Sequence, residues 1–268
     1  MRIDWTVETA IANLQPTVEG SLRYYAAWWL GHFRISRPEA IDGLLVALND
    51  ETHRSPDGGL ALCRNAARAL GKLQDPRIVS ALRQRLTCED YYVREVVIQA
   101  LESQADPSCI PDLIAFLEGG AEAAISIPGK PHLVQPYEAV LEALGTLQAK
   151  SVAPLIQEFL LHPVPKVQLA AARALYQLTQ EPQYGERLVL GLRHEKLVVR
   201  RSALMDLGAS GYIAGASAIA ATLAENSLKL TALKDLFNAH LHQSGTKNDP
   251  ENLDATSEQL ISLMDALL

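Results

Sequence analysis

The hexapeptide AARALG at residues 66–71 recurs with small changes along the chain and decides the fold. The same pattern gives AAWWLG at residues 26–31, AARALY at 171–176 and ALMDLG at 203–208. Its recurring leucines are Leu30, Leu70, Leu101, Leu144, Leu175, Leu207 and Leu236. Four of the steps between them are 29 to 32 residues long, and the other two are 40 and 43 residues long. These spacings indicate a repeat of about 31 residues that is interrupted by two insertions. Self-similarity at such a period is typical of repeat proteins.

Each repeat also contains a second segment with apolar residues at three- and four-residue spacing, which predicts an amphipathic helix. These segments are Pro76–Leu86, Ile110–Leu117, Val152–Leu160 and Ile213–Leu223. Asp75-Pro76 and Asp106-Pro107 predict a capping carboxylate followed by proline at the first helical position.

Four glycines follow the marker leucines directly, namely Gly31, Gly71, Gly145 and Gly208. We expect them to end the first helices, where a left-handed residue is favoured. The small residues inside these helices should also let neighbouring helices approach closely.

One helix pair cannot bury its apolar face alone, so neighbouring pairs must stack. The sequence therefore predicts an all-α protein, a HEAT-like or armadillo-like α-solenoid of about six helix pairs with capping helices. Residues 1–268 are expected to form a single domain. It comprises an N-terminal cap at 1–20, HEAT-like repeats at 21–241 with insertions at 51–59 and 119–136, and a loop and C-terminal capping helix at 242–268.

Composition and charge exclude several classes of function. The net charge of −7 disfavours nucleic acid as a partner, because nucleic-acid proteins usually carry a basic face. Cys63, Cys88 and Cys109 are far apart and show no metal-ligand spacing, so we expect reduced thiols and no metal. No signal peptide is evident, and the longest apolar stretch, residues 212–224, is shorter than the roughly 18 residues of a membrane span. The expected protein is soluble and cytoplasmic, without a membrane partner.

The two insertions are the expected location of function, because insertions in a solenoid form loops on one face. The first combines His53, Arg54 and Asp57 in a turn-rich segment. The second carries Lys130 and His132 between prolines, which stiffen the loop.

Six segments, in order along nearly the whole chain, resemble the E subunits of the E/F-type phycocyanobilin lyases. They are residues 23–31 (RYYAAWWLG), 53–59 (HRSPDGG), 88–95 (CEDYYVRE), 129–138 (GKPHLVQPYE), 206–212 (DLGASGY) and 224–230 (AENSLKL). The extreme N-terminus and residues 242–256 match least.

The resemblance implies an enzyme component that works as a heterodimer with a homologous F-type subunit. Such a heterodimer attaches phycocyanobilin, an open-chain tetrapyrrole, to a cysteine of the apo-phycocyanin alpha subunit by adding the thiol to the ethylidene group of ring A. Phycocyanobilin is then a substrate, and no prosthetic group is expected. The lyase would order the bilin, neutralise its propionates and supply a proton donor.

The resemblance and side-chain chemistry together give the candidate site residues. The expected catalytic residues are Asp57, Asp90 and His132. The expected substrate-binding residues are Tyr24, Trp28, His53, Arg54, Arg64, Tyr91, Tyr92, Arg94, Lys130, Tyr137 and Glu138.

Each role has a structural alternative. Arg54 suits a propionate and Asp57 the pyrrole N–H groups, but both could lie in a solvated turn. Asp90 could be a helix cap, and Arg94 could bridge neighbouring repeats. Trp28 and Trp29 point to different sides of their helix, so one should be in the core and the other free to stack on a pigment.

Three other functions stay open at this point. A related chain could be a lyase-isomerase subunit or a protein that removes bilins, and a non-catalytic HEAT scaffold could grip a partner helix. HEAT-repeat di-iron hydroxylases need several His-Glu pairs, whereas this chain has only His194-Glu195.

Overall fold

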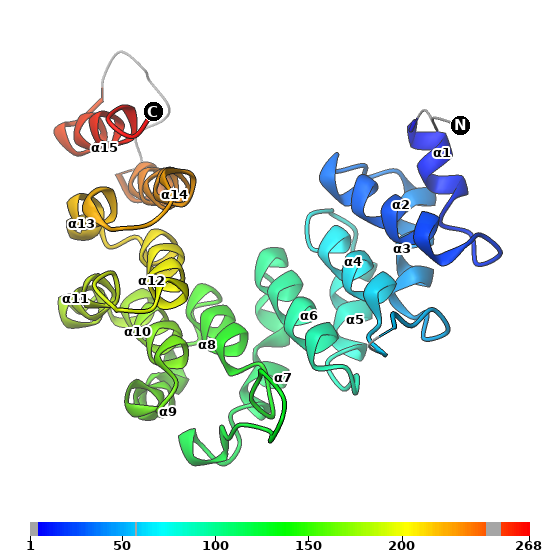
Figure 1. Ribbon diagram of the computed structural model, residues 1–268, viewed down its shortest axis with the longest axis horizontal. Helices are drawn as coiled ribbons and strands as arrows, with labels where there is room; N and C mark the ends of the chain where they lie inside the picture. Colours follow the sequence, from blue (N-terminus) through cyan, green and yellow to red (C-terminus); the bar gives the residue numbers. More distant parts are fainter. Residues whose placement is uncertain (1–4, 57, 245–252) are drawn as a thin grey trace. The chain divides into compact units, whose positions relative to one another are not determined.

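The computed structural model describes residues 5–56, 58–244 and 253–268, and these residues form fifteen α-helices and five short 3-10 helices (Figure 1). The β interaction found in these ranges is an isolated antiparallel bridge between Ser126 and Leu133. The predicted all-α class is therefore confirmed.

The chain divides into two compact units. Unit 1 comprises Met1–Glu118 and Ala124–Ala143, and unit 2 comprises Gly119–Ala123 and Leu144–Leu268. The single domain expected from the sequence stays a prediction.

Unit 1 alternates first and second helices of the repeat. After α1 (Val7–Ala12) come α2 (Gly20–His32), α3 (Pro38–Leu48), α4 (Ala61–Leu70), α5 (Arg77–Gln84), α6 (Tyr91–Gln104), α7 (Ile110–Ala115) and the start of α8 (Tyr137–Thr146). The first helices stack in series, α2 on α4 and α4 on α6, and the second helices α3 and α5 pack mainly against the first helix of the following repeat, α4 and α6 respectively. Thr6 caps α1, and the carboxylate of Asp75 accepts a hydrogen bond from the backbone N–H of Arg77, as the Asp-Pro signal predicts.

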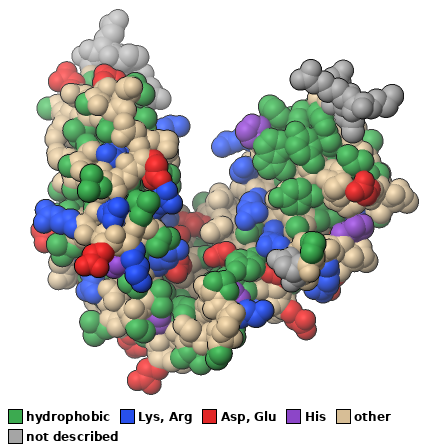
Figure 2. All heavy atoms as spheres, in the orientation of Figure 1, with side chains coloured by type: hydrophobic (Ala, Val, Ile, Leu, Met, Phe, Trp, Pro, Cys, Tyr) green, Lys and Arg blue, Asp and Glu red, His purple; other side chains and the backbone are tan. Residues whose placement is uncertain are grey.

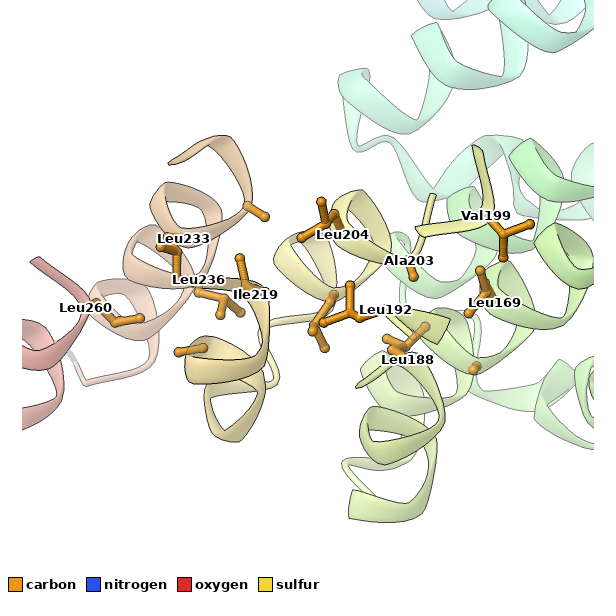
Figure 3. Close-up of a cluster of buried hydrophobic side chains, with 14 residues drawn as sticks. Leu169, Leu188, Leu192, Val199, Ala203, Leu204, Ile219, Leu233, Leu236 and Leu260 are labelled. Atoms are coloured by element: carbon orange, nitrogen blue, oxygen red, sulfur yellow. The ribbon is translucent and has the colours of Figure 1, made fainter. Parts of the chain in front are cut away.

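Unit 2 continues the alternation. It contains α9 (Ala153–Glu158), α10 (Pro165–Thr179), α11 (Pro182–Gly191), α12 (Leu197–Ser210), α13 (Ala216–Ala221), α14 (Asn226–Ser244) and α15 (Ala255–Asp265). Helix α14 extends to Ser244, so the expected loop does not begin at His242, and the remainder of that loop up to residue 252 lies outside the described residues. Figure 3 shows how leucines from consecutive helices, among them Leu188, Leu204, Leu236 and Leu260, form one buried cluster through α10–α15.

The glycines after the marker leucines do not have the predicted left-handed conformation. Positive φ angles occur three or four residues after the position that follows a marker leucine, at Arg34, Ala105, Gln148, Gln180 and Gly211. The glycines instead allow close helix packing. A Cβ atom on Gly31 would lie 2.6 Å from the Cα of Ala69, and one on Gly145 would lie 2.6 Å from the Cα of Ala174. Helix packing, and not helix termination, therefore explains this part of the motif.

The fourth residue of most first helices donates hydrogen bonds from a long polar side chain to carbonyl groups at preceding turns. This residue is Arg23 in α2, Arg94 in α6, Gln168 in α10, Arg200 in α12 and Lys229 in α14, and their acceptors include the carbonyls of Leu14, Cys88, His162, His194 and Ala220. Turn carbonyls that the helices leave unpaired are thereby satisfied. The same contact recurs in both units and fixes the turn that precedes each of these five first helices.

Candidate functional site

A cavity of about 370 Å³ lies in unit 1 where the first insertion, the start of α6 and the second insertion meet. Its lining combines cationic, acidic and aromatic side chains with two glycines. The lining residues are Arg54, Gly58, Gly59, Glu89, Asp90, Tyr91, Tyr92, Arg94, Ile127, Lys130 and His132. Seven of the predicted site residues are therefore brought together.

The second insertion forms a small hairpin that presents its polar residues to this cavity. The bridge between Ser126 and Leu133 is extended by a 3.0 Å hydrogen bond from Val134 N to Ile125 O. The tip turns at Gly129, whose φ of +75° is a left-handed conformation that glycine adopts without strain. Lys130 and His132 line the cavity from this tip.

Arg94 ties the hairpin to the start of α6. Its Nη1 donates to Cys88 O at 2.7 Å and Glu89 O at 3.1 Å, and its Nη2 donates to Val134 O at 3.2 Å. Its Nε donates to the side-chain oxygen of Gln135 at 3.1 Å. Each guanidinium nitrogen thus has a partner within the protein, and the side chain joins α6 to the second insertion.

Asp90 caps α6 and reaches the start of α4. Its Oδ1 accepts the backbone N–H groups of Tyr92 at 2.8 Å and Val93 at 3.2 Å. Its Oδ2 accepts the N–H of Leu60 at 2.8 Å, at the end of the first insertion. These contacts are those of a cap that joins two repeats, and the catalytic role expected for Asp90 stays a prediction.

Aromatic rings form one wall of the cavity. The rings of Tyr91 and His132 are stacked, with centroids 4.0 Å apart and planes 11° from parallel. Tyr92 meets His132 edge to face at 5.6 Å, and the guanidinium of Arg64 lies 5.6 Å from the Tyr92 ring centroid. Burial raises the pKa of the Tyr91 hydroxyl, and the carboxylates of Glu95 and Glu138 raise it further, so Tyr91 stays neutral.

Arg54 belongs to two adjoining cavities. Its Nη1 donates to Gly58 O at 3.0 Å, and the side chain is otherwise exposed. The second cavity, of about 250 Å³, shares Arg54, Glu89 and Asp90 with the first and adds Arg85 and Cys88. Asp57, the third predicted catalytic residue, lies outside the described residues.

Besides Tyr24 and Trp28, four predicted residues do not line the cavity. His53 contacts Asp50 and the buried Arg23, each 3.1 Å from its Nδ1. Tyr137 is almost fully buried, with a pKa raised by burial, and Glu138 follows it on α8 at half exposure. Arg64 does not line the cavity, but its guanidinium contacts the ring of Tyr92, which does.

Tyr24 and Trp28 lie on the exposed surface of α2, away from the cavity lining. The ring centroid of Trp28 lies 4.9 Å from that of His32, on which it stacks, and 5.2 Å from that of Tyr25, so these three side chains form an aromatic row on α2. Figure 2 shows hydrophobic side chains gathered at the surface near the N-terminal helices. Trp29 is half-buried against Phe33 at 4.6 Å, so the prediction that one of the two tryptophans is in the core is wrong.

Sequence reasoning missed several features of the site. Glu89 and Ile127 line the cavity, although nothing in their sequence context distinguishes them. The buried Arg23 was also missed, and its place as the fourth residue of a first helix is the signal that identifies it.

The three cysteines differ in burial, which gives a direct test of the packing. Burial raises the pKa of the Cys63 thiol to about 12 and that of Cys109 to about 11, whereas Cys88 is half-buried and lines two cavities. Because the thiolate is the reactive form, brief iodoacetamide treatment of the folded protein at pH 8 should label Cys88 alone. Peptide mass spectrometry checks this, with the urea-unfolded protein, in which all three should react, as control. Labelling of Cys63 or Cys109 at the rate of Cys88 would contradict the packing.

Within the described ranges, no group of three or more His, Cys, Asp or Glu residues is placed to hold a metal ion. No helix in those ranges combines the length and apolar character needed to cross a bilayer.

The stacked helix pairs define the class of this protein: it is a HEAT-repeat protein, and its two insertions line a cavity. The family model for HEAT repeats matches residues 7–102 and 60–125.

Whole-chain comparisons then show the family. The phycocyanobilin lyase subunit alpha of Synechocystis sp. PCC 6803 is 56% identical over 264 residues, covering 98% of this chain and 97% of its own. The bilin biosynthesis protein PecE of Mastigocladus laminosus is 44% identical over 87% of this chain and 82% of its own. The solved complex of CpcE and CpcF of phycocyanin lyase from Nostoc sp. PCC7120 contains a chain that is 52% identical. It matches with a TM-score of 0.89 over 100% of this chain and 96% of that one. The chain belongs to the phycocyanobilin lyase alpha-subunit family.

Proposed function

We propose that this chain is the bilin-binding subunit of a heterodimeric lyase that attaches phycocyanobilin to a cysteine of the phycocyanin alpha subunit through a thioether. Relatives of nearly equal length carry the name of this activity. The observation that carries the proposal here is the meeting of both insertions at one cavity, since a bare scaffold has no need of either insertion.

The cavity has the chemistry that a tetrapyrrole requires. Its volume of about 370 Å³ falls within the ~300–1,000 Å³ of small-molecule sites and would enclose part of an open-chain bilin. Arg54 and Lys130 are suited to bind propionates, because both are exposed cations that line the cavity. The stacked Tyr91–His132 pair offers a flat wall for a pyrrole ring.

Other predicted residues take supporting roles in this proposal. Arg94 and Asp90 position the hairpin and the two helix starts, since their polar atoms are bonded to the protein. Tyr24 and the aromatic row that contains Trp28 lie on the same unit but not in the cavity lining, so their contact with substrate is a separate prediction.

The proposed partners are an F-type lyase chain and apo-phycocyanin alpha. The solved complex of a 52% identical relative contains both CpcE and CpcF, which supports an F-type partner. The nucleophilic thiol comes from the acceptor protein, and phycocyanobilin is a substrate, with no prosthetic group in the lyase. A cytoplasmic location fits this set of partners.

Mixing this chain, an F-type chain, phycocyanobilin and apo-phycocyanin alpha tests the proposal on a denaturing gel. A covalently fluorescent alpha-subunit band that requires both lyase chains is the expected result. No band above the spontaneous background would overturn the proposal.

Loss of bilin from holo-phycocyanin in the same gel would favour a bilin-removing role, and a shifted bilin absorption spectrum on the product would favour a lyase-isomerase. The 44% identity to PecE, named for bilin biosynthesis, keeps these bilin-related alternatives in view. A scaffold would give no change in bilin absorbance when the pigment is added.

Replacing Arg54 with alanine should slow transfer about 10- to 100-fold, because a charge-assisted hydrogen bond contributes ~1.5–3 kcal/mol. Asp57→Asn should have a comparable effect if Asp57 binds pyrrole N–H groups. Single-turnover transfer rates measure both. Arg37→Ala is the matched control, since Arg37 is an exposed arginine of the same unit that pairs with Glu8. Normal transfer in both site variants would exclude this site assignment.

A further inference from the structure

The ring of His132 has a defined tautomer in this site. Its Nδ1 lies 2.8 Å from the carbonyl oxygen of Leu133. A carbonyl oxygen only accepts hydrogen bonds, so Nδ1 carries a proton in both the neutral and the charged ring. In the neutral ring, Nε2 is therefore a hydrogen-bond acceptor. Among the described residues, none is hydrogen-bonded to Nε2.

The ring is held rigidly while it lines the cavity. Tyr91 stacks on one face at 4.0 Å, and the Tyr92 ring contacts it edge to face at 5.6 Å. The Ser126–Leu133 bridge fixes the adjacent backbone, and Arg94 holds Val134 from α6. A fixed ring with one acceptor nitrogen on a ligand cavity is the arrangement of a general base.

The charged and titratable groups that line the cavity with His132 come from three segments, while Glu95, Glu138 and Arg64 lie behind the two tyrosines. Arg54 belongs to the first insertion, Lys130 to the hairpin, and Glu89, Asp90, Tyr91, Tyr92 and Arg94 to the start of α6. Both carboxylate oxygens of Asp90 accept backbone N–H groups, and Arg94 donates to carbonyls. Neither side chain is therefore the proton partner of Nε2.

We propose that His132 is the general base of the attachment reaction, an inference that rests on the function proposed above. Nε2 takes the proton of the acceptor thiol while the sulfur attacks the ethylidene carbon of the bilin. The S–H bond and the π bond of the ethylidene break, and a C–S bond forms. The imidazolium then returns the proton to the ring carbon at the other end of the former double bond. The thiol adds across one double bond, so the step needs no oxidant or reductant.

The resemblance implies that the lyase supplies a proton donor, whereas the geometry of His132 points to a base. A neutral ring whose Nδ1 proton is held by Leu133 has no proton to donate through Nε2. It donates only after it has taken the thiol proton.

The test compares His132→Asn with the unsubstituted protein, each with the F-type chain, phycocyanobilin and apo-phycocyanin alpha, from pH 6.5 to 9.5. Asparagine keeps an N–H donor for the Leu133 carbonyl but has no base, and His132→Gln is the second variant. Single-turnover transfer should slow about 100-fold at pH 7, within the range of general-base catalysis. The deficit should shrink to a few-fold near pH 9.5, because a cysteine thiol of pKa about 8.5 then ionises without a base. Added imidazole should partly restore transfer at pH 7.

Bilin absorbance titrations of each variant separate binding from transfer. Transfer rates in both variants equal to that of the unsubstituted protein would overturn the proposal. A rate deficit that is the same at every pH and insensitive to imidazole would also overturn it, since that pattern marks a structural role. An unsubstituted protein that forms no adduct would overturn the proposed function and the base role with it.

Discussion

Arg94→Ala is expected to slow bilin transfer about 100-fold while the helices stay folded. Arg94 is the fourth residue of α6, and its guanidinium joins the turn before α6 to Val134 and Gln135 of the hairpin. Without it, the hairpin that carries Lys130 and His132 loses its attachment to the wall formed by Tyr91. A misplacement of about 1 Å in a reacting group is enough to cost ~100-fold in rate. Single-turnover transfer and circular dichroism, measured together, check this expectation.

The chain contains its own matched control for that experiment. Arg200 is the fourth residue of α12 and donates to the carbonyls of His194, Glu195 and Leu223 in unit 2. Arg200→Ala removes the same kind of contacts at a place that does not line the unit 1 cavity, so it should cost similar stability and leave transfer unchanged. Equal losses of transfer in the two variants would show that Arg94 acts through general stability and not through the hairpin.

The repeat could be predicted from the sequence because its signal is local. Leucine and small residues recur at fixed positions in each first helix, and the helices observed at residues 61–70, 165–179 and 197–210 contain them. The function of the adjoining glycines could not be predicted in the same way. Whether Gly31 ends a helix or admits Ala69 depends on a neighbour about forty residues away, and local conformational preference does not specify that neighbour.

The site was predictable at the level of segments and less so at the level of atoms. The two insertions interrupt the repeat, so they pointed to the segments whose Arg54, Lys130 and His132 line one cavity. The hydrogen-bond partners of a side chain, by contrast, depend on tertiary packing. Asp90 proved to be a cap that also holds Leu60, and His53 proved to face Asp50 instead of the cavity.

Replacing Arg23 with methionine is expected to destabilise the protein by about 3–5 kcal/mol, the cost of leaving one partner of a buried ion pair alone. Arg23 is fully buried, pairs with Asp50 and donates through Nε to Leu14 O at 3.2 Å. Methionine fills most of the volume but leaves the Asp50 carboxylate, which is only 10% exposed, without its counter-ion. Urea unfolding at pH 7 measures the loss, and Arg23→Met combined with Asp50→Asn should recover part of it because the double variant buries no charge.

The pH dependence gives an independent check on this ion pair. Burial alone would raise the pKa of Asp50, but hydrogen bonds from Thr52 and Arg23 outweigh it and hold the pKa well below its usual range. A depressed carboxyl pKa stabilises the folded state above the unfolded pKa of about 3.9, and this contribution is lost as the pH falls towards the folded value. In Arg23→Met the pKa of Asp50 in the folded state should rise, so acid protonates this carboxylate and removes the buried charge. The difference in unfolding free energy between the unsubstituted protein and Arg23→Met should therefore narrow as the pH falls from about 6 to 4. A difference that stays constant or widens would mean that Arg23 stabilises the fold by packing and not by its charge.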